Sequence, residues 1–254
     1  LSIAEQLAVI AGASIVLMTV LWFVQRRTGD AGIVDVGWSY ALGAAAVFAA
    51  LTGGGAPVPR IVIAALVGVW SVRLGTHILT DRVLTGIEDG RYTMLREKAG
   101  ARLQPILFVF YQFQAILVPV LSLPFVIACA SETAGIAWHV WLGAAVWAGA
   151  LIGEWIADRQ LKAFKRRRRE AGAAGGVCDR GLWRYSRHPN YFFEWFTWVG
   201  YALVALGGPA AWAAWIAPAV MLVLILKVTG IPPTEARAVR SRGDAYRRYQ
   251  RTTR

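Results

Sequence analysis

Cysteine is scarce in this chain, and what the chain lacks excludes several kinds of protein. Its two cysteines, Cys129 and Cys178, are too few for a disulfide framework or a cysteine-ligated zinc site. No internal repeat is visible, and the lack of two similar halves argues against a transporter built from inverted repeats. The residues before the first apolar stretch include Glu5 and no Lys or Arg, so we expect no cleavable signal peptide.

Long apolar stretches dominate the sequence. With 57% hydrophobic residues and 12 tryptophans, it is too apolar for a soluble domain of 254 residues. Seven stretches can each form most of a membrane-spanning helix, which needs about 20 residues: 7–24, 33–51, 61–79, 105–130, 136–156, 192–206 and 210–229. We therefore predict an all-α, polytopic integral membrane protein with seven transmembrane helices in one domain, residues 1–254.

The net charge of +12 is unevenly placed along the chain. Of the 27 Lys and Arg residues, 25 lie in alternate connections between the apolar stretches or from Lys227 onward, and only Arg60 and Arg73 do not. Positively charged connections stay in the cytoplasm, so we predict an outside N-terminus and a cytoplasmic C-terminus, in a bacterial inner membrane. The basic run at 165–169 follows the same rule and attracts anionic membrane lipids, so no nucleic-acid partner is predicted.

The segment at 181–194 joins a basic stretch directly to an apolar helix. Pro189 suits the first position of a helix, because its fixed φ fits there and its missing N–H would have no partner. The preceding His188 is then extended. Free amide donors at the helix N-terminus lie next to Arg184 and Arg187. The junction is predicted to bind an anion at the membrane edge, such as a phosphorylated cofactor.

The helix that begins at Pro189 carries a polar and aromatic face. Tyr191, Glu194, Trp198 and Tyr201 recur at helical spacing, and Asn190 lies four residues before Glu194. An ionisable side chain inside a membrane normally faces a cavity or a partner. Glu194 is therefore a functional candidate, and the alternative is a structural ion pair with an arginine of another helix.

The acidic and basic side chains at 88–96 allow two interpretations. They can form a solvated loop held by weak ion pairs. Alternatively, Arg91 and Arg96 contact phosphate while Glu88 or Asp89 binds ribose hydroxyls. The tail has a similar ambiguity, because Tyr246 and Tyr249 belong either to a helix at the lipid headgroups or to a cover over a cofactor.

Asp35 and His77 are titratable residues within or near predicted spans. Asp35 can pair with Arg73 across neighbouring helices, and His77 can be an interfacial side chain near a helix end. The functional interpretation is that these residues take part in proton transfer.

Two segments resemble a known superfamily. The motif Gly-Leu-Trp-x-Tyr-x-Arg-His-Pro-Asn-Tyr-x-x-Glu at 181–194, continued by Trp-x-Gly-Tyr-Ala-Leu at 198–203, resembles the C-terminal domain of the steroid 5α-reductase and sterol reductase superfamily. The segments at 35–38, 70–75, 88–92 and 243–252 extend the resemblance over most of the chain, towards a bacterial branch of that superfamily.

The resemblance implies a seven-helix membrane enzyme that uses NADPH to reduce a carbon–carbon double bond in a lipid-like substrate. The cofactor-binding part would cover about 80–254. By matching positions, Asn190 and Glu194 would orient the nicotinamide carboxamide. Four residues of the motif would hold the phosphate or the ribose: Arg184, Arg187, His188 and Tyr191. The group at 88–96 and the tail tyrosines would close over the cofactor.

The chain departs from the superfamily pattern at two places. The steroid 5α-reductases carry a Gln-Glu pair in the second span, whereas this chain has Asp35, Trp38 and Tyr40 there. The resemblance therefore does not extend to steroid specificity, and the proton donor is expected among Tyr92, His77 and Asp35. Phe193 stands where relatives usually have glycine, so the local packing is expected to differ.

Two other functions compete with a reductase. Isoprenylcysteine and phospholipid methyltransferases share an Arg-His-Pro-x-Tyr segment, followed by a membrane helix and a late acidic motif, and use S-adenosylmethionine. In this chain Thr234-Glu235 supplies one acid at that late position. A third interpretation is a non-catalytic lipid-binding or scaffold protein, in which the polar residues within the membrane only join helices.

Overall fold

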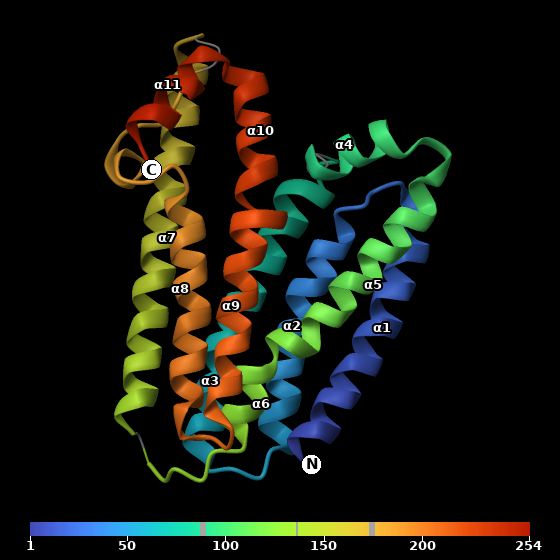
Figure 1. Cartoon of the computed structure of the whole chain (residues 1–254), viewed down its shortest axis with the longest axis vertical. Coiled ribbons are helices and arrows are strands. Elements are labelled where there is room, and N and C mark those ends of the chain that lie inside the picture. The colour runs from blue at the N-terminus through green and yellow to red at the C-terminus, as the bar shows by residue number, and fades with distance from the viewer. Residues whose placement is uncertain (87–89, 136, 173–175) are drawn as a thin grey trace. The chain divides into compact units, whose positions relative to one another are not determined.

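The computed structural model describes residues 1–86, 90–135, 137–172 and 176–254. Every regular element in these ranges is helical (Figure 1). Six helical stretches of the described chain are long and apolar enough to cross a membrane: Ile3–Thr28, Ile33–Thr52, Pro57–Val83, Gly90–Cys129, Trp138–Glu170 and Ala211–Arg242. The predicted all-α integral membrane class is therefore confirmed.

The seventh predicted span, at 192–206, corresponds to the shorter helix α8 (Pro189–Val204), which has 16 residues. Sixteen residues rise about 24 Å, less than the roughly 30 Å of a bilayer core. A 3-10 turn, η4 (Ala205–Gly207), lengthens it slightly. The predicted span at 105–130 is interrupted at Ser122. Helix α5 (Leu103–Leu121) ends just before this residue, and α6 (Leu123–Cys129) has Pro124 in its first turn.

The chain divides into two compact units. The first unit, Leu1–Ala144 with Tyr201–Ala217, contains α1 (Ile3–Thr28), α2 (Ile33–Thr52), α3 (Pro57–Ile78), α4 (Gly90–Ala99), α5 and α6. It also holds the π-helical turn η1 (Leu79–Val83) and the 3-10 turns η2 (Gly100–Arg102), η4 and η5 (Ala211–Trp215). Within it α1 runs beside α5, and α2 beside α3 (Figure 1).

Small residues allow α2 and α3 to approach closely. A Cβ on Gly43 would lie 2.3 Å from Ser71 Oγ, and a Cβ on Gly75 would lie 2.9 Å from the Tyr40 ring. Ser71 Oγ donates to the Ser39 carbonyl across the same interface at 2.8 Å. Close backbone approach with a hydroxyl bond is a typical way for helices to associate in a membrane.

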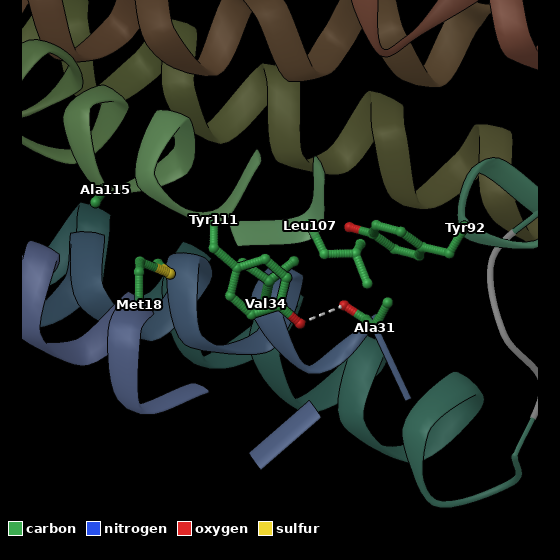
Figure 2. Packing of buried hydrophobic residues seen from close by; sticks show 7 residues of the cluster. All are labelled: Met18, Ala31, Val34, Tyr92, Leu107, Tyr111 and Ala115. Carbon is green, nitrogen blue, oxygen red and sulfur yellow. Dashed lines mark hydrogen bonds between the residues drawn. The ribbon is translucent and has the colours of Figure 1, made fainter. Parts of the chain in front are cut away.

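The first unit has a hydrophobic cluster where α1, α2, α4 and α5 meet (Figure 2). Its buried members are Met18, Ala31, Val34, Tyr92, Leu107, Tyr111 and Ala115. The Tyr111 hydroxyl donates to the Ala31 carbonyl at 3.0 Å, shown as a dashed line in Figure 2. The cluster also encloses Tyr92, which brings a second titratable hydroxyl into a largely apolar region.

The second unit comprises Ala145–Gly200 and Pro218–Arg254. It contains most of α7 (Trp138–Glu170) and α8, the 3-10 turn η3 (Gly181–Arg184), and the end of α9 (Ile216–Val223). The π-helical turn η6 (Leu224–Val228), α10 (Ile231–Arg242) and α11 (Asp244–Thr252) complete it. Helices α7 and α8 lie side by side (Figure 1) because Gly153 leaves room for Phe193, whose ring carbon would be 2.4 Å from a Cβ at position 153.

Candidate functional site

The segment before α8 is anchored on α7 by three contacts. The Leu182 amide donates to Gln160 Oε1 at 2.9 Å, and the Trp183 indole donates to the Ala157 carbonyl at 2.9 Å. Gly181 has a φ of +61°, and a Cβ there would lie 2.5 Å from the Gln160 amide group. Only glycine fits this close, left-handed position. The start of the sequence motif is therefore held in one place.

Glu235 of α10 brings together three residues that are distant in sequence. Arg187 Nε donates to Glu235 Oε1 at 2.6 Å, and His188 Nε2 lies 3.1 Å from the same oxygen. Gln250 Nε2 donates to the second oxygen, Oε2, at 3.0 Å. The Arg187 and Glu235 side chains are 21% and 19% exposed, so this ion pair is largely shielded from water.

The C-terminal helix α11 is fastened to the same segment. Arg187 Nη1 donates to the carbonyls of Gln250 at 3.3 Å and Thr253 at 2.5 Å. The Tyr249 hydroxyl donates to the Trp183 carbonyl and, at 3.4 Å, to that of Ser186. Arg187 and Tyr249 were both predicted to bind cofactor, and the structure places them in contacts that join α11 to the motif.

Burial changes the acid–base properties of this region. Burial lowers the pKa of His188 below its usual value, and the hydrogen bond and charge of Glu235 only partly oppose that effect. Burial also raises the pKa of Tyr246 and Tyr249. At neutral pH His188 is therefore uncharged and both tyrosines keep their protons.

Helix α8 begins at Pro189, as predicted. The His188 ring stacks on Tyr191 with 5.5 Å between centroids and a 13° interplanar angle. The Tyr191 hydroxyl lies 3.0 Å from Thr234 Oγ1 of α10. Asn190 is half-buried in the first turn. The first turn of α8 is thus tied to the first turn of α10.

One turn further along α8, Glu194 accepts a hydrogen bond. Trp198 Nε1 donates to Glu194 Oε1 at 3.1 Å. Trp198 is fully buried, whereas Glu194 is half-buried. The expected polar face of α8 therefore exists at these two positions.

An open hollow of about 800 Å³ lies between α11 and the segment before α8. It is lined by Val177, Asp179, Arg180, Gly181, Arg184, Ala245, Arg248, Tyr249, Thr252 and Thr253. Three arginines and one aspartate give this wall a net positive charge. Pockets for cofactors and drug-sized ligands have volumes of roughly 300 to 1,000 Å³, so the hollow is large enough for a nucleotide cofactor.

Sequence reasoning found only part of this site. Arg184 and Tyr249 were predicted and line the hollow, whereas Arg180 and Arg248 were not predicted. Glu235 was noted only as a late acid, although it is one of two acidic residues after Glu194. A rare acid in an arginine-rich segment is a signal for an ion pair, and it could have identified Glu235 as a partner of an arginine.

A second group of titratable residues lies in the first unit. Arg91 Nη2 donates to Asp35 Oδ2 at 2.8 Å, and the Tyr92 hydroxyl donates to Asp35 Oδ1 at 3.1 Å. Tyr92 is 2% exposed, and its ring packs edge-on against Phe110. The structure thus joins two of the predicted proton-transfer residues, Tyr92 and Asp35, and pairs Asp35 with Arg91.

The remaining predicted residues of the first unit lie apart from this group. His77 Nδ1 is 3.2 Å from Asp81 Oδ2, and both side chains are about half exposed. The Arg96 guanidinium donates to the Gly29 carbonyl. Glu88 and Asp89 lie outside the described residues.

The fold and these two groups define a helical integral membrane protein with an arginine-lined hollow in its second unit. A family model described as a protein of unknown function, DUF1295, matches residues 21–253. The chain belongs to this family. Comparison with curated proteins and with solved structures found no match.

Proposed function

We propose that this protein is an NADPH-dependent reductase of a carbon–carbon double bond in a lipid-like substrate. The observation that carries the proposal is the arginine-lined hollow beside the motif at 181–194. The resemblance of that motif to the steroid 5α-reductase and sterol reductase superfamily supplies the reaction type. Bound NADPH would supply the hydride for one alkene carbon and be oxidised to NADP⁺, while the other carbon would take a proton.

The hollow fits a phosphorylated cofactor by charge. Arg180, Arg184 and Arg248 supply guanidinium groups, which match phosphate oxygens in geometry and charge. Thr252 and Thr253 add hydroxyl groups to the same wall. S-adenosylmethionine carries two positive groups against one carboxylate, so a wall with this net charge disfavours it. We assign the three arginines to the phosphates of NADPH.

The other motif residues have different roles in this proposal. Asn190 and Glu194 orient the nicotinamide carboxamide, as the resemblance implies. Arg187 and Tyr249 are positioning residues, because their hydrogen bonds hold α11 against the motif. Without those bonds the two sides of the hollow, which come from residues 179–184 and from α11, would separate.

Tyr92 is the proposed proton donor. Its hydroxyl is buried and hydrogen-bonded to Asp35, which Arg91 keeps in place. Asp35 orients the hydroxyl, and the apolar surroundings exclude water from it. Tyr92→Phe should lower the rate of NADPH oxidation with a panel of lipid enones by about 10²-fold or more, while NADPH affinity stays unchanged. A variant with the wild-type rate would remove Tyr92 from the mechanism.

The proposed topology has seven spans, with the N-terminus outside and the C-terminus in the cytoplasm. It rests on the distribution of basic residues, which lie almost entirely in alternate connections. In this topology α8 crosses the membrane although it is short, and the hollow faces the cytoplasm, where NADPH is available.

The cofactor assignment is tested by binding to the purified chain in detergent, followed by tryptophan fluorescence. Arg184→Gln and Arg248→Gln should each weaken NADPH binding about tenfold or more, since each removes a charged hydrogen bond. Arg247→Gln is the matched control, because Arg247 is adjacent in sequence, pairs with Asp244 at 3.4 Å and does not line the hollow. Equal effects of all three substitutions, or no NADPH binding by the wild type, would contradict the proposal.

One observation favours a second candidate, an S-adenosylmethionine-dependent membrane methyltransferase. The resembling methyltransferases combine an Arg-His-Pro segment with a late acidic motif, and here Arg187 and His188 both contact Glu235. The same binding experiment separates the two functions. Tight binding of S-adenosylmethionine without any response to NADPH would select the methyltransferase.

A further inference from the structure

A second hollow in the second unit has a different lining from the proposed cofactor site. Its volume is about 420 Å³, and it lies where the ends of α7 and α10 meet. It is lined by Phe164, Lys165, Arg168, Arg169, Gly176, Ser241 and Arg242. The two hollows share no lining residue. We call the smaller one the basic hollow.

Four of the lining side chains of the basic hollow are cationic: Lys165, Arg168, Arg169 and Arg242. Two neighbouring acids lie against other arginines, since Glu170 is 3.8 Å from Arg166 and Asp244 is 3.4 Å from Arg247. Asp158 of α7 acts electrostatically on Lys165. The basic residues come from two helices that are far apart in sequence. Their convergence is therefore a property of the fold and not only of the basic run at 165–169.

Arg168 is held in place by the backbone opposite it. A Cβ at Gly176 would lie 2.8 Å from Arg168 Cζ and 2.9 Å from Nη1. Gly176 has a φ of +84°, which favours glycine. The guanidinium therefore packs against a backbone position that has no side chain.

We expect the basic hollow to lie at the outer edge of the lipid headgroup layer. On α7, Trp155 is 51% exposed and the Arg159 guanidinium lies 4.5 Å from its ring centroid. Such a pair marks the membrane interface. Lys165 follows Arg159 by six residues, or about 9 Å along the helix. The headgroup layer is roughly 5 to 8 Å thick on each side, so Lys165 lies just beyond it, and long basic side chains can reach back to the phosphate groups.

We propose that the basic hollow binds the phosphate of an anionic membrane phospholipid. The cations of α7 and α10 surround the phosphate, and Phe164 contacts the glycerol end of the lipid. This inference does not depend on the reductase proposal. It adds a lipid-binding site that joins the end of α7 to the end of α10.

The test uses the full chain in a neutral detergent and a fluorescent phosphatidylglycerol titrated as mixed micelles. The double substitution Arg169→Gln with Arg242→Gln should weaken binding roughly 25-fold, at about fivefold for each charge near the membrane surface. The matched control, Arg166→Gln with Arg167→Gln, removes two charges from the same basic run outside the hollow. We expect the control to change binding less than fivefold.

Three results would overturn the proposal. The first is an equal loss of affinity in the two double variants, which would indicate binding to diffuse surface charge. The second is binding of phosphatidylcholine as tight as that of phosphatidylglycerol. The third is binding of inorganic phosphate as tight as that of the lipid, which would indicate a site for free phosphate.

A second variant keeps the test valid if the double substitution disturbs folding. Ser241 is exposed, and its hydroxyl donates only to carbonyls of its own helix. Ser241→Asp adds a carboxylate to the basic hollow without removing a cation. It should weaken phosphatidylglycerol binding at least fivefold while the unfolding temperature in neutral detergent stays the same. Unchanged lipid binding by this variant would also contradict the proposal.

Discussion

At the scale of single residues, Glu235 determines how the motif at 181–194 is arranged. Its carboxylate accepts hydrogen bonds from Arg187 and Gln250, and one of its oxygens lies 3.1 Å from His188 Nε2. A largely shielded arginine without its carboxylate partner would keep its charge at a high cost. Removing Glu235 is therefore costly mainly because it leaves the charge of Arg187 shielded from water and without a carboxylate partner.

Glu235→Ala should destabilise the protein by about 2 to 3 kcal/mol, because it leaves Arg187 without its carboxylate partner. The unfolding midpoint in one detergent is the measurement. Glu170→Ala is the control, since Glu170 belongs to an exposed i, i+4 pair with Arg166, and such pairs contribute roughly 0.5 kcal/mol or less. Equal destabilisation by both substitutions would mean that Glu235 does not organise the motif.

His188 should make stability depend on pH. Burial, opposed in part by Glu235, holds the pKa of folded His188 below its usual 6.5. The unfolded chain therefore binds a proton more readily, so stability is complete above pH 6.5 and is lost as the pH falls towards the lower folded pKa. The unfolding temperature of the wild type should therefore decrease as the pH is lowered from 7.5 to 5.5. His188→Gln should show a smaller fall, and an equal fall would exclude His188 as the cause.

At the scale of helices, the contact between α7 and α8 depends on one residue without a side chain. Phe193 occupies the place above Gly153 where a Cβ would lie 2.4 Å from the ring. The sequence predicted unusual packing at Phe193, because relatives usually have glycine there. The structure shows that the glycine of this contact is on the neighbouring helix.

Gly153→Ala should destabilise the protein by about 1 to 3 kcal/mol, since the added methyl group overpacks the contact. Combining it with Phe193→Ala should restore part of that loss, and a double-mutant cycle of unfolding midpoints measures the coupling. Gly149→Ala is the matched control one turn earlier on α7, where a Cβ would meet nothing within 4 Å. Additive effects of the substitutions at 153 and 193 would contradict direct packing.

Helix positions followed from the sequence more closely than side-chain partners did. The stretch predicted at 33–51 is α2, Ile33–Thr52, and Pro189 begins α8, because apolar length and proline geometry are local properties. The contact between Arg187 and Glu235 joins residues 48 positions apart. Such a pair depends on how α8 and α10 pack, and several arginines in the chain offered equivalent partners.

At the scale of the whole molecule, the number of spans decides which side of the membrane holds the proposed cofactor site. Helix α8 has 16 residues and is absent from the six stretches long enough to cross by themselves. A short span is tolerated when the bilayer thins locally or flanking residues reach the interface. If α8 crosses, the connections before and after it lie on opposite sides.

Cysteine labelling in intact cells tests whether α8 crosses the membrane. The buried Cys129 and Cys178 are first replaced by alanine. Tyr185→Cys and Pro209→Cys then place single thiols in exposed positions before and after α8. Seven spans with a cytoplasmic C-terminus predict that a membrane-impermeant maleimide labels position 209 and labels position 185 only after the cells are opened. The same labelling at both positions would show that α8 does not cross, and the charge distribution would then no longer place the arginine-lined hollow in the cytoplasm.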